Sequence, residues 1–205
     1  MGPRSRAAAS VLSRAGFKEV HATLGGMKTW KGVSAQGFPE VSMALFPPDQ
    51  YFEDAIAVAW HLEEGTRLFY AEVSAMTAAG KPGNVFRDLA AAEEGHKALL
   101  SSLYHDLLGK PFQPVDPFKL SYPIDELDSI MEGGSRLSEA LVWLPGKPEK
   151  DILEFSVALE TNAYDRYLTL ASKVEDEHSR GVFKALSRAE KKHLEELTEM
   201  FEQLI

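Results

Sequence analysis

Apolar side chains recur at alternating steps of three and four residues from about residue 49 to the end of the chain. This spacing places side chains along one face of an α-helix. The pattern predicts four long helices, at about residues 50–79, 84–108, 149–175 and 178–204. Short turns, the first of them Lys81-Pro82-Gly83, separate the two helices of each pair. We therefore expect two antiparallel helix hairpins.

A long segment from Gly109 to about Pro148 connects the two hairpins and contains several prolines. Its length allows the third helix to run beside the first, instead of simply reversing from the second. Within this segment we expect short helices near residues 124–131 and 137–142. The predicted fold is all-α, a four-helix bundle with one long crossover.

The residues before the helical pattern differ from it in composition. Residues 1–37 are rich in Gly, Ala and Ser and have a basic start, while residues 38–48 resemble a linker that ends in Pro47-Pro48. Two prolines just before a helical pattern are typical of a helix boundary. We therefore divide the chain into an N-terminal segment (1–37), a linker (38–48) and a helical domain (49–205).

Polar residues interrupt the apolar stripe of every predicted helix. In the first hairpin they are Glu63, Tyr70, Glu93 and His96. The second hairpin repeats each of them 97 residues later, as Glu160, Tyr167, Glu190 and His193. The apolar and small positions around them repeat as well. We interpret the helical domain as an internally duplicated helix hairpin.

The overall composition excludes several classes of function. The chain has 31 acidic and 22 basic side chains, which argues against a nucleic-acid-binding surface. It has neither a run of about 18 apolar residues nor an apolar N-terminal secretion segment, so we expect no membrane partner. The absence of cysteine excludes disulfides, thiolate nucleophiles and cysteine-held metal centres within this chain.

Four glutamates and two histidines on apolar helix faces require a partner. A carboxylate buried alone costs several kcal/mol or takes up a proton, and four at one level of a bundle repel one another. Two divalent cations would balance four carboxylates. Two Glu-x-x-His pairs and two lone glutamates form the ligand pattern of di-iron and di-manganese bundles. The predicted metal ligands are Glu63, Glu93, His96, Glu160, Glu190 and His193.

Six protein ligands shared between two metals leave open coordination positions. Mixed carboxylate and imidazole donors with open positions suit iron or manganese that reacts with O2 or peroxide. We expect two iron ions, with manganese or zinc as alternatives. Tyr70 and Tyr167 lie two helical turns after the lone glutamates, so we assign them a catalytic role as hydrogen-bond donors to ligand carboxylates. The alternative is an inherited carboxylate cluster that no longer binds metal.

Residues 50–205 resemble the rubrerythrin-like branch of the ferritin-like superfamily. The resemblance rests on the Glu-x6-Tyr and Glu-x-x-His segments above and on the stretch Glu-Thr-Asn-Ala-Tyr-Asp-Arg-Tyr at 160–167. It implies a non-haem di-iron site, a homodimer, and reduction of hydrogen peroxide in the cytoplasm.

The chain departs from this family in two respects. Rubrerythrins carry an iron centre held by four cysteines that supplies electrons, whereas this chain has no cysteine and would need an external electron donor. They also carry a glutamate where this chain has Ala163, and the equivalent position in the first helix is Thr66. Two hypotheses follow: a di-iron oxidoreductase that reacts with H2O2 or O2, or an iron- or manganese-binding or sensing module without efficient turnover.

Residues 1–34 resemble the C-terminal third of a rhodanese-like domain. The resemblance rests on Gly2-Pro3-Arg4-Ser5, a following helix and short strand through Val20, and a Gly25-Gly26-Met27 turn before Trp30. In that family the sulfur-carrying cysteine lies just upstream of the Gly-x-Arg-Ser stretch, a position that falls before Met1. We therefore expect a truncated remnant with no sulfurtransferase activity in the chain as given.

Overall fold

The structure is a computed structural model that describes residues 18–20, 52–77, 81–112 and 129–203. Within these ranges the fold is all-helical, with four long helices, one short α-helix and one 3-10 turn. The elements are α3 (Phe52–Met76), α4 (Lys81–Leu108), η2 (Glu132–Gly134), α5 (Leu137–Trp143), α6 (Glu149–Lys173) and α7 (Glu177–Glu202). The predicted N-terminal segment, the linker and the rhodanese-like remnant lie outside the described residues, apart from residues 18–20.

The four long helices agree with the sequence prediction to within a few residues. The main difference is the start of α4, because Lys81-Pro82-Gly83, predicted as a turn, forms its first turn. Proline is tolerated there because its missing N–H would have no partner in the first helical turn. The start of α7 is fixed by Asp176, whose side chain accepts a hydrogen bond from the backbone N–H of Ser179 at 2.7 Å.

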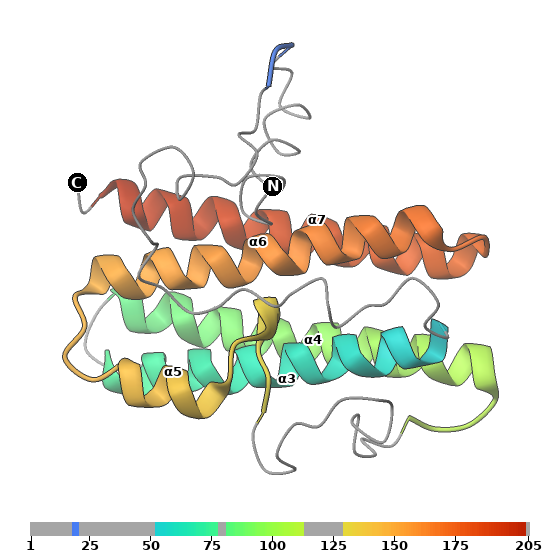
Figure 1. Ribbon diagram of the computed structural model, residues 1–205, viewed down its shortest axis with the longest axis horizontal. Coiled ribbons are helices and arrows are strands. Elements are labelled where there is room, and N and C mark those ends of the chain that lie inside the picture. The colour runs from blue at the N-terminus through green and yellow to red at the C-terminus, as the bar shows by residue number, and fades with distance from the viewer. Residues whose placement is uncertain (1–17, 21–51, 78–80, 113–128, 204–205) are drawn as a thin grey trace, which may run out of the picture.

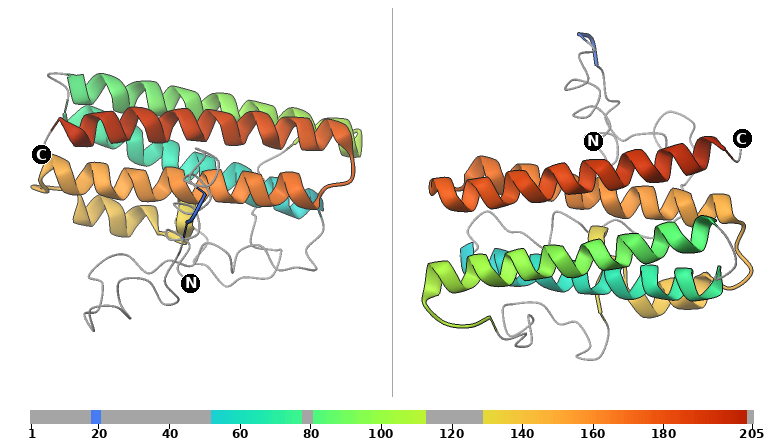
Figure 2. Two further views of the ribbon diagram at one scale, coloured as in Figure 1. Left: turned by 90° about the horizontal axis from the view of Figure 1, so that it is seen from above. Right: turned by 180° about the vertical axis from the view of Figure 1, so that it is seen from behind.

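Helices α3 and α4 pack along each other as one hairpin, and α6 and α7 as the other (Figure 1). Figures 1 and 2 show that α4 ends at one end of the bundle and that α6 begins at the opposite end. Between them, η2 contacts both α3 and α6, and α5 contacts α3. The connection between the hairpins therefore contributes to the packing of the bundle.

The first short helix predicted in this connection is wrong for the part that the structure describes. Residues 129–131 are not helical, and Ile130 instead forms an isolated antiparallel bridge with Arg136. The turn between them contains Gly133 and Gly134, both with positive φ, a conformation that favours glycine. Residues 124–128 lie outside the described ranges. The second predicted helix is observed as α5.

Gly65 allows the connection to lie directly on α3. A Cβ atom at this position would be 2.1 Å from the carbonyl oxygen of Ile130. No side chain larger than hydrogen fits that space without moving the backbone of one segment. Gly65 therefore explains how η2 reaches the middle of the bundle.

Two apolar clusters fill the bundle, one on each side of a central polar layer. One cluster includes Phe69, Tyr70, Phe86, Leu89, Leu153 and Leu197. The other includes Ile56, Leu100, Leu103, Tyr167, Phe183 and Leu186. Along every long helix the polar ligand positions fall between members of the two clusters. In the described residues, no helix combines the length and apolar character needed to cross a membrane.

Candidate metal centre

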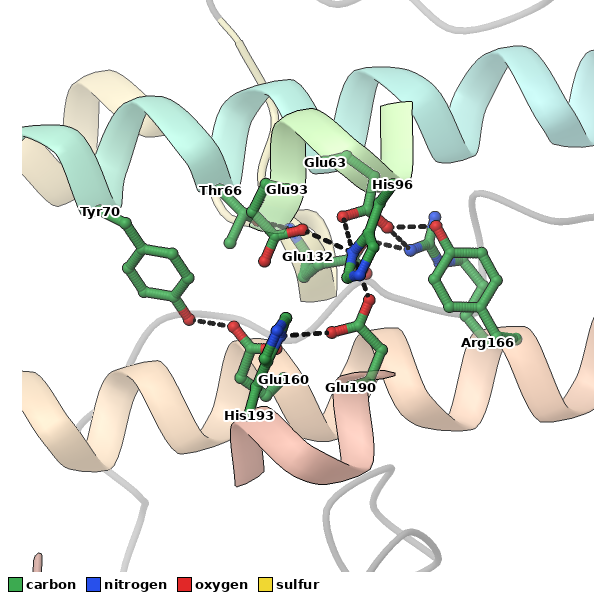
Figure 3. Close-up of polar contacts among 11 residues, drawn as sticks. Glu63, Thr66, Tyr70, Glu93, His96, Glu132, Glu160, Arg166, Glu190 and His193 are labelled. Carbon is green, nitrogen blue, oxygen red and sulfur yellow. Dashed lines mark hydrogen bonds and ion pairs between the residues drawn. The ribbon is translucent and has the colours of Figure 1, made fainter. Parts of the chain in front are cut away.

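The structure brings the six predicted ligand side chains together in the central layer (Figure 3). Each has at most 7% of its surface exposed. Their ligand atoms form two groups, each with all atoms within 4.8 Å of one another: Glu63, Glu93, His96 and Glu190, and then Glu93, Glu160, Glu190 and His193. Glu93 and Glu190 belong to both groups. Each group could hold a metal ion, and the two groups have two carboxylates in common.

The two histidines occupy equivalent places in the two halves of the site. Nδ1 of His96 lies 3.0 Å from Glu93 Oε2 and 3.4 Å from Glu63 Oε2. Nδ1 of His193 lies 3.1 Å from Glu190 Oε2 and 3.2 Å from Glu160 Oε2. The two rings stack with their centroids 5.4 Å apart. The sequence repeat is therefore also a repeat in space.

The two tyrosines each bond a glutamate of the opposite hairpin. The Tyr70 hydroxyl donates to Glu160 Oε1, and the Tyr167 hydroxyl donates to Glu63 Oε1. Burial, with the charge of Glu160, raises the pKa of Tyr70 well above its ordinary value. Burial raises the pKa of Tyr167 as well, and together with nearby carboxylates such as Glu63 it outweighs the opposing charge of Arg166. Both hydroxyls therefore keep their protons and act as donors.

The structure adds two charged residues that the sequence pattern did not indicate. Arg166, buried on α6, places Nη2 2.6 Å from Glu63 Oε1 and 2.5 Å from Glu132 Oε1. Glu132 is buried on η2, and its backbone N–H donates to Thr66 Oγ1 at 3.2 Å. Arg166 lies one position before the stripe residue Tyr167, and its counterpart 97 residues earlier is Phe69. That break in the repeat is the signal that could have marked it.

With only the protein's own charges present, the carboxylates differ strongly in proton affinity. Burial and the charge of Glu190 raise the pKa of Glu160 to about 7. Burial and the charges of Glu63 and Glu190 raise the pKa of Glu93 well above its usual range. Burial opposes ionisation of Glu190 as well, but the charge of His96 lowers the pKa of Glu190 to about 2. Glu93 and Glu160 therefore favour their protonated forms more than a free carboxyl does, whereas Glu190 favours its ionised form.

The histidines are held in the protonated form. Burial lowers the pKa of His193, but hydrogen bonds with Glu160 and Glu190 outweigh burial and raise it to about 10. Burial lowers the pKa of His96 too, but the charge of Glu190 and the hydrogen bonds with the surrounding glutamates together outweigh burial and raise it. A divalent cation requires neutral imidazole and ionised carboxylate ligands, so it would displace protons from this cluster.

The donor set fits a pair of divalent metal ions. Four carboxylates and two imidazoles are the donors that iron, manganese and zinc accept. Glu190 Oε1 is buried without a hydrogen-bond partner, although His96 Nδ1 lies 3.0 Å from it. A cation bound by both groups would satisfy this oxygen. The residues present are therefore compatible with metal binding.

Comparisons with known proteins agree with this picture. The family model described as rubrerythrin matches residues 151–205, which contain Glu160, Tyr167, Glu190 and His193. The solved structure of "Hypothetical Protein Pfu-1136390-001 From Pyrococcus furiosus" is similar, with a TM-score of 0.59 and 21% identity. The alignment covers 82% of this chain and 96% of that chain. A comparison with curated proteins found no match.

The two findings carry different weight. Likeness to the Pyrococcus furiosus structure at this identity shows the fold alone. The rubrerythrin match covers the second hairpin and supports placing the chain in the ferritin-like di-iron superfamily. The all-helical architecture of the described residues is consistent with that fold.

Proposed function

We propose that this protein is a non-haem di-iron oxidoreductase that reacts with hydrogen peroxide or O2, built on a ferritin-like bundle with one long crossover. The observation that carries the proposal is the pair of overlapping ligand groups that share Glu93 and Glu190. Glu93 and Glu190, which belong to both groups, would hold two cations close together, as a two-electron reaction at a metal pair requires.

The buried charges support two divalent ions. Apart from Lys97, which pairs with the more exposed Glu64 and Glu94, the buried charged residues of the described core are Arg166 and five glutamates, at positions 63, 93, 132, 160 and 190. With these groups ionised and both histidines neutral, their net charge is −4. Two divalent cations balance that charge, whereas the unbalanced cluster would be costly to bury.

When bound, two iron ions would supply the redox change and open coordination positions for peroxide or O2. The protein residues hold and orient the ligand set. The Tyr70 hydroxyl fixes Glu160 Oε1 and the Tyr167 hydroxyl fixes Glu63 Oε1. The second oxygen of each glutamate then faces the histidine of the same half, at 3.2 Å in one half and 3.4 Å in the other. The apolar clusters on both sides exclude bulk water from the centre.

The proposal extends to the electron donor, the cellular location and the oligomeric state. Because the chain contains no cysteine, electrons would come from an external donor. We place the protein in the cytoplasm as a homodimer, without nucleic-acid or membrane partners. The substrate is a small molecule that reaches the buried centre.

Metal stoichiometry and peroxide consumption test the proposal together. After anaerobic loading with Fe(II) and removal of loose metal, we expect about two irons per chain by elemental analysis. The double replacement Glu190→Ala with His193→Ala should abolish iron retention and peroxide consumption, while the circular dichroism spectrum remains that of a helical protein. His178→Ala, at an exposed position, is the matched control and should change neither. Equal peroxide consumption by the metal-free double variant would overturn the proposal.

The second candidate is a metal-binding or sensing module without efficient turnover. Two hydrogen bonds to Glu63 favour this candidate. The Oε1 atom of Glu63 accepts from both Arg166 and Tyr167, and these bonds hold the carboxylate in place. Ala163, where the resembling family has a glutamate, adds no carboxylate that could move during a redox cycle. Tight binding of two metal ions without turnover, even with an artificial reductant, would favour this candidate.

A further inference from the structure

The ligands of the candidate metal centre repeat across the two hairpins, but their charged neighbours do not. Position 166 on α6 is a buried arginine, and the position 97 residues earlier on α3 is the buried Phe69. Glu132, the other partner of Arg166, comes from the connection between the hairpins, which has no repeated copy. A fixed cation is thus present beside one half of a site whose ligand residues repeat in the other half.

Arg166 acts directly on one ligand. Its Nη2 lies 2.6 Å from Glu63 Oε1, which also accepts the Tyr167 hydroxyl. The equivalent oxygen of Glu160 accepts the Tyr70 hydroxyl, and Phe69 brings no charge to that half. A divalent cation near Glu63 therefore meets a competing cation on its own ligand, whereas one near Glu160 does not.

The connection holds this arginine in place. Glu132 Oε1 lies 2.5 Å from Arg166 Nη2, and the Glu132 backbone is bonded to Thr66. The absence of a side chain at Gly65 lets the backbone of the connection lie directly against α3. The guanidinium also lies over the Tyr167 ring, 4.1 Å from its centroid. Glu132 supplies a counter-charge for Arg166 in the core, while the same Nη2 also faces Glu63.

We propose that Arg166, positioned by Glu132, makes the two metal positions unequal and sets the order in which they fill. The ion bound by Glu93, Glu160, Glu190 and His193 binds first and more tightly. The ion bound by Glu63, Glu93, His96 and Glu190 binds second. This inference rests on the two-metal centre of the proposed function, and it assigns Arg166 and Glu132 as positioning residues.

Titration with Mn2+ alone tests the order, because the EPR signal of free Mn2+ reports binding without any turnover. Full-length protein should show two resolved binding steps. His193→Ala leaves the position beside Arg166, and His96→Ala leaves the other position. We expect the dissociation constant of the remaining ion to be at least about tenfold larger in His193→Ala, which corresponds to about 1.4 kcal/mol.

The charge-neutral double replacement Glu132→Gln with Arg166→Gln tests the cause. It removes the cation while keeping polar side chains that can still pair. Added to His193→Ala, it should tighten Mn2+ binding at least about threefold, and added to His96→Ala it should leave binding nearly unchanged. The matched control makes the same replacements at the surface pair Glu177 and Arg180 and should alter neither constant.

The outcomes separate this inference from the proposed function. Two Mn2+ ions bound in one unresolved step, or equal constants in the two single-histidine variants, would overturn the order while leaving the two-metal centre intact. Failure of the unaltered protein to bind Mn2+ or Fe(II) would overturn the proposed function itself. If the double replacement prevents folding, as judged by circular dichroism, the comparison of the two single-histidine variants decides alone.

Discussion

At the scale of the residue, two hydrogen bonds between a tyrosine and a glutamate orient the ligands of the candidate metal centre. Each ligand glutamate from α3 or α6 has one oxygen held by a tyrosine of the opposite hairpin. These bonds are buried and involve a group that carries charge, which makes them stronger than bonds between neutral groups. The tyrosines therefore join the two hairpins as well as orient the ligands.

Replacing either tyrosine should show how much its hydrogen bond contributes to the stability of the bundle. Tyr70→Phe and Tyr167→Phe keep the buried ring but remove the donor to the carboxylate. We expect each to lower the free energy of unfolding of the metal-free protein by about 1.5–3 kcal/mol. Chemical denaturation measures this change. Tyr104→Phe, a replacement at a ring packed against Phe112, is the control and should have a smaller effect.

At the scale of the element, the connection between the hairpins is part of the centre. It lies on α3 at Gly65, reverses direction at Gly133 and Gly134, and delivers Glu132 to Arg166. Glycine is needed in α3 because the backbone of another segment occupies the space of its side chain. The same residue type on α4, at Gly95, has no such role, because a Cβ atom added there would have nothing within 4 Å.

These two glycines form a matched pair for mutation. Gly65→Ala should destabilise the protein by about 1–3 kcal/mol, because the added methyl group displaces the connection by overpacking. Gly95→Ala should stabilise it by up to about 1 kcal/mol, because alanine favours the helix and the site is open. Thermal and urea unfolding of both variants measures the difference. Equal effects at the two positions would contradict the packing described for the connection.

At the scale of the whole molecule, protons and metal ions compete for one buried cluster. The pKa of Glu160 is raised to about 7 by burial and by the charge of Glu190. The pKa of His193 is raised to about 10, because its hydrogen bonds with Glu160 and Glu190 outweigh burial. A raised pKa contributes stability below the unfolded value, and this contribution is lost as the pH rises through the folded value. The contribution of Glu160 is therefore lost as the pH rises from 4.5 to about 7, and that of His193 as it rises from 6.5 to about 10.

Metal binding should show the opposite dependence on pH. Because the ion replaces protons, its affinity rises with pH and its binding releases protons. We expect the rise in Tm on adding Mn2+ to be larger at about pH 8 than at about pH 6, and proton release to appear in a weakly buffered indicator assay. The Glu190→Ala, His193→Ala double variant should show neither effect. A pH-independent rise in Tm would contradict the proton competition.

The sequence by itself determined the four long helices and the six residues that meet between them. Helical periodicity is local, so it places Glu63, Glu93 and their repeats on the apolar faces of their helices, and the short turn within each hairpin brings its two glutamates near each other. The paired tyrosines follow from the same spacing, although their exchange between hairpins does not. The match of the rubrerythrin family model to residues 151–205 is consistent with the ligand pattern of the second hairpin.

Only the tertiary structure showed which charged residues lie next to the ligands. Glu132 lies outside the helical stripes, and its backbone contact with Thr66 joins residues 66 positions apart. Arg166 has no special spacing, and its burial depends on a partner supplied by the connection. Periodicity cannot report such pairs, because they depend on where an irregular segment docks. The chain's local pattern therefore sets the repeated ligands, while long-range packing sets the charge that makes their two halves differ.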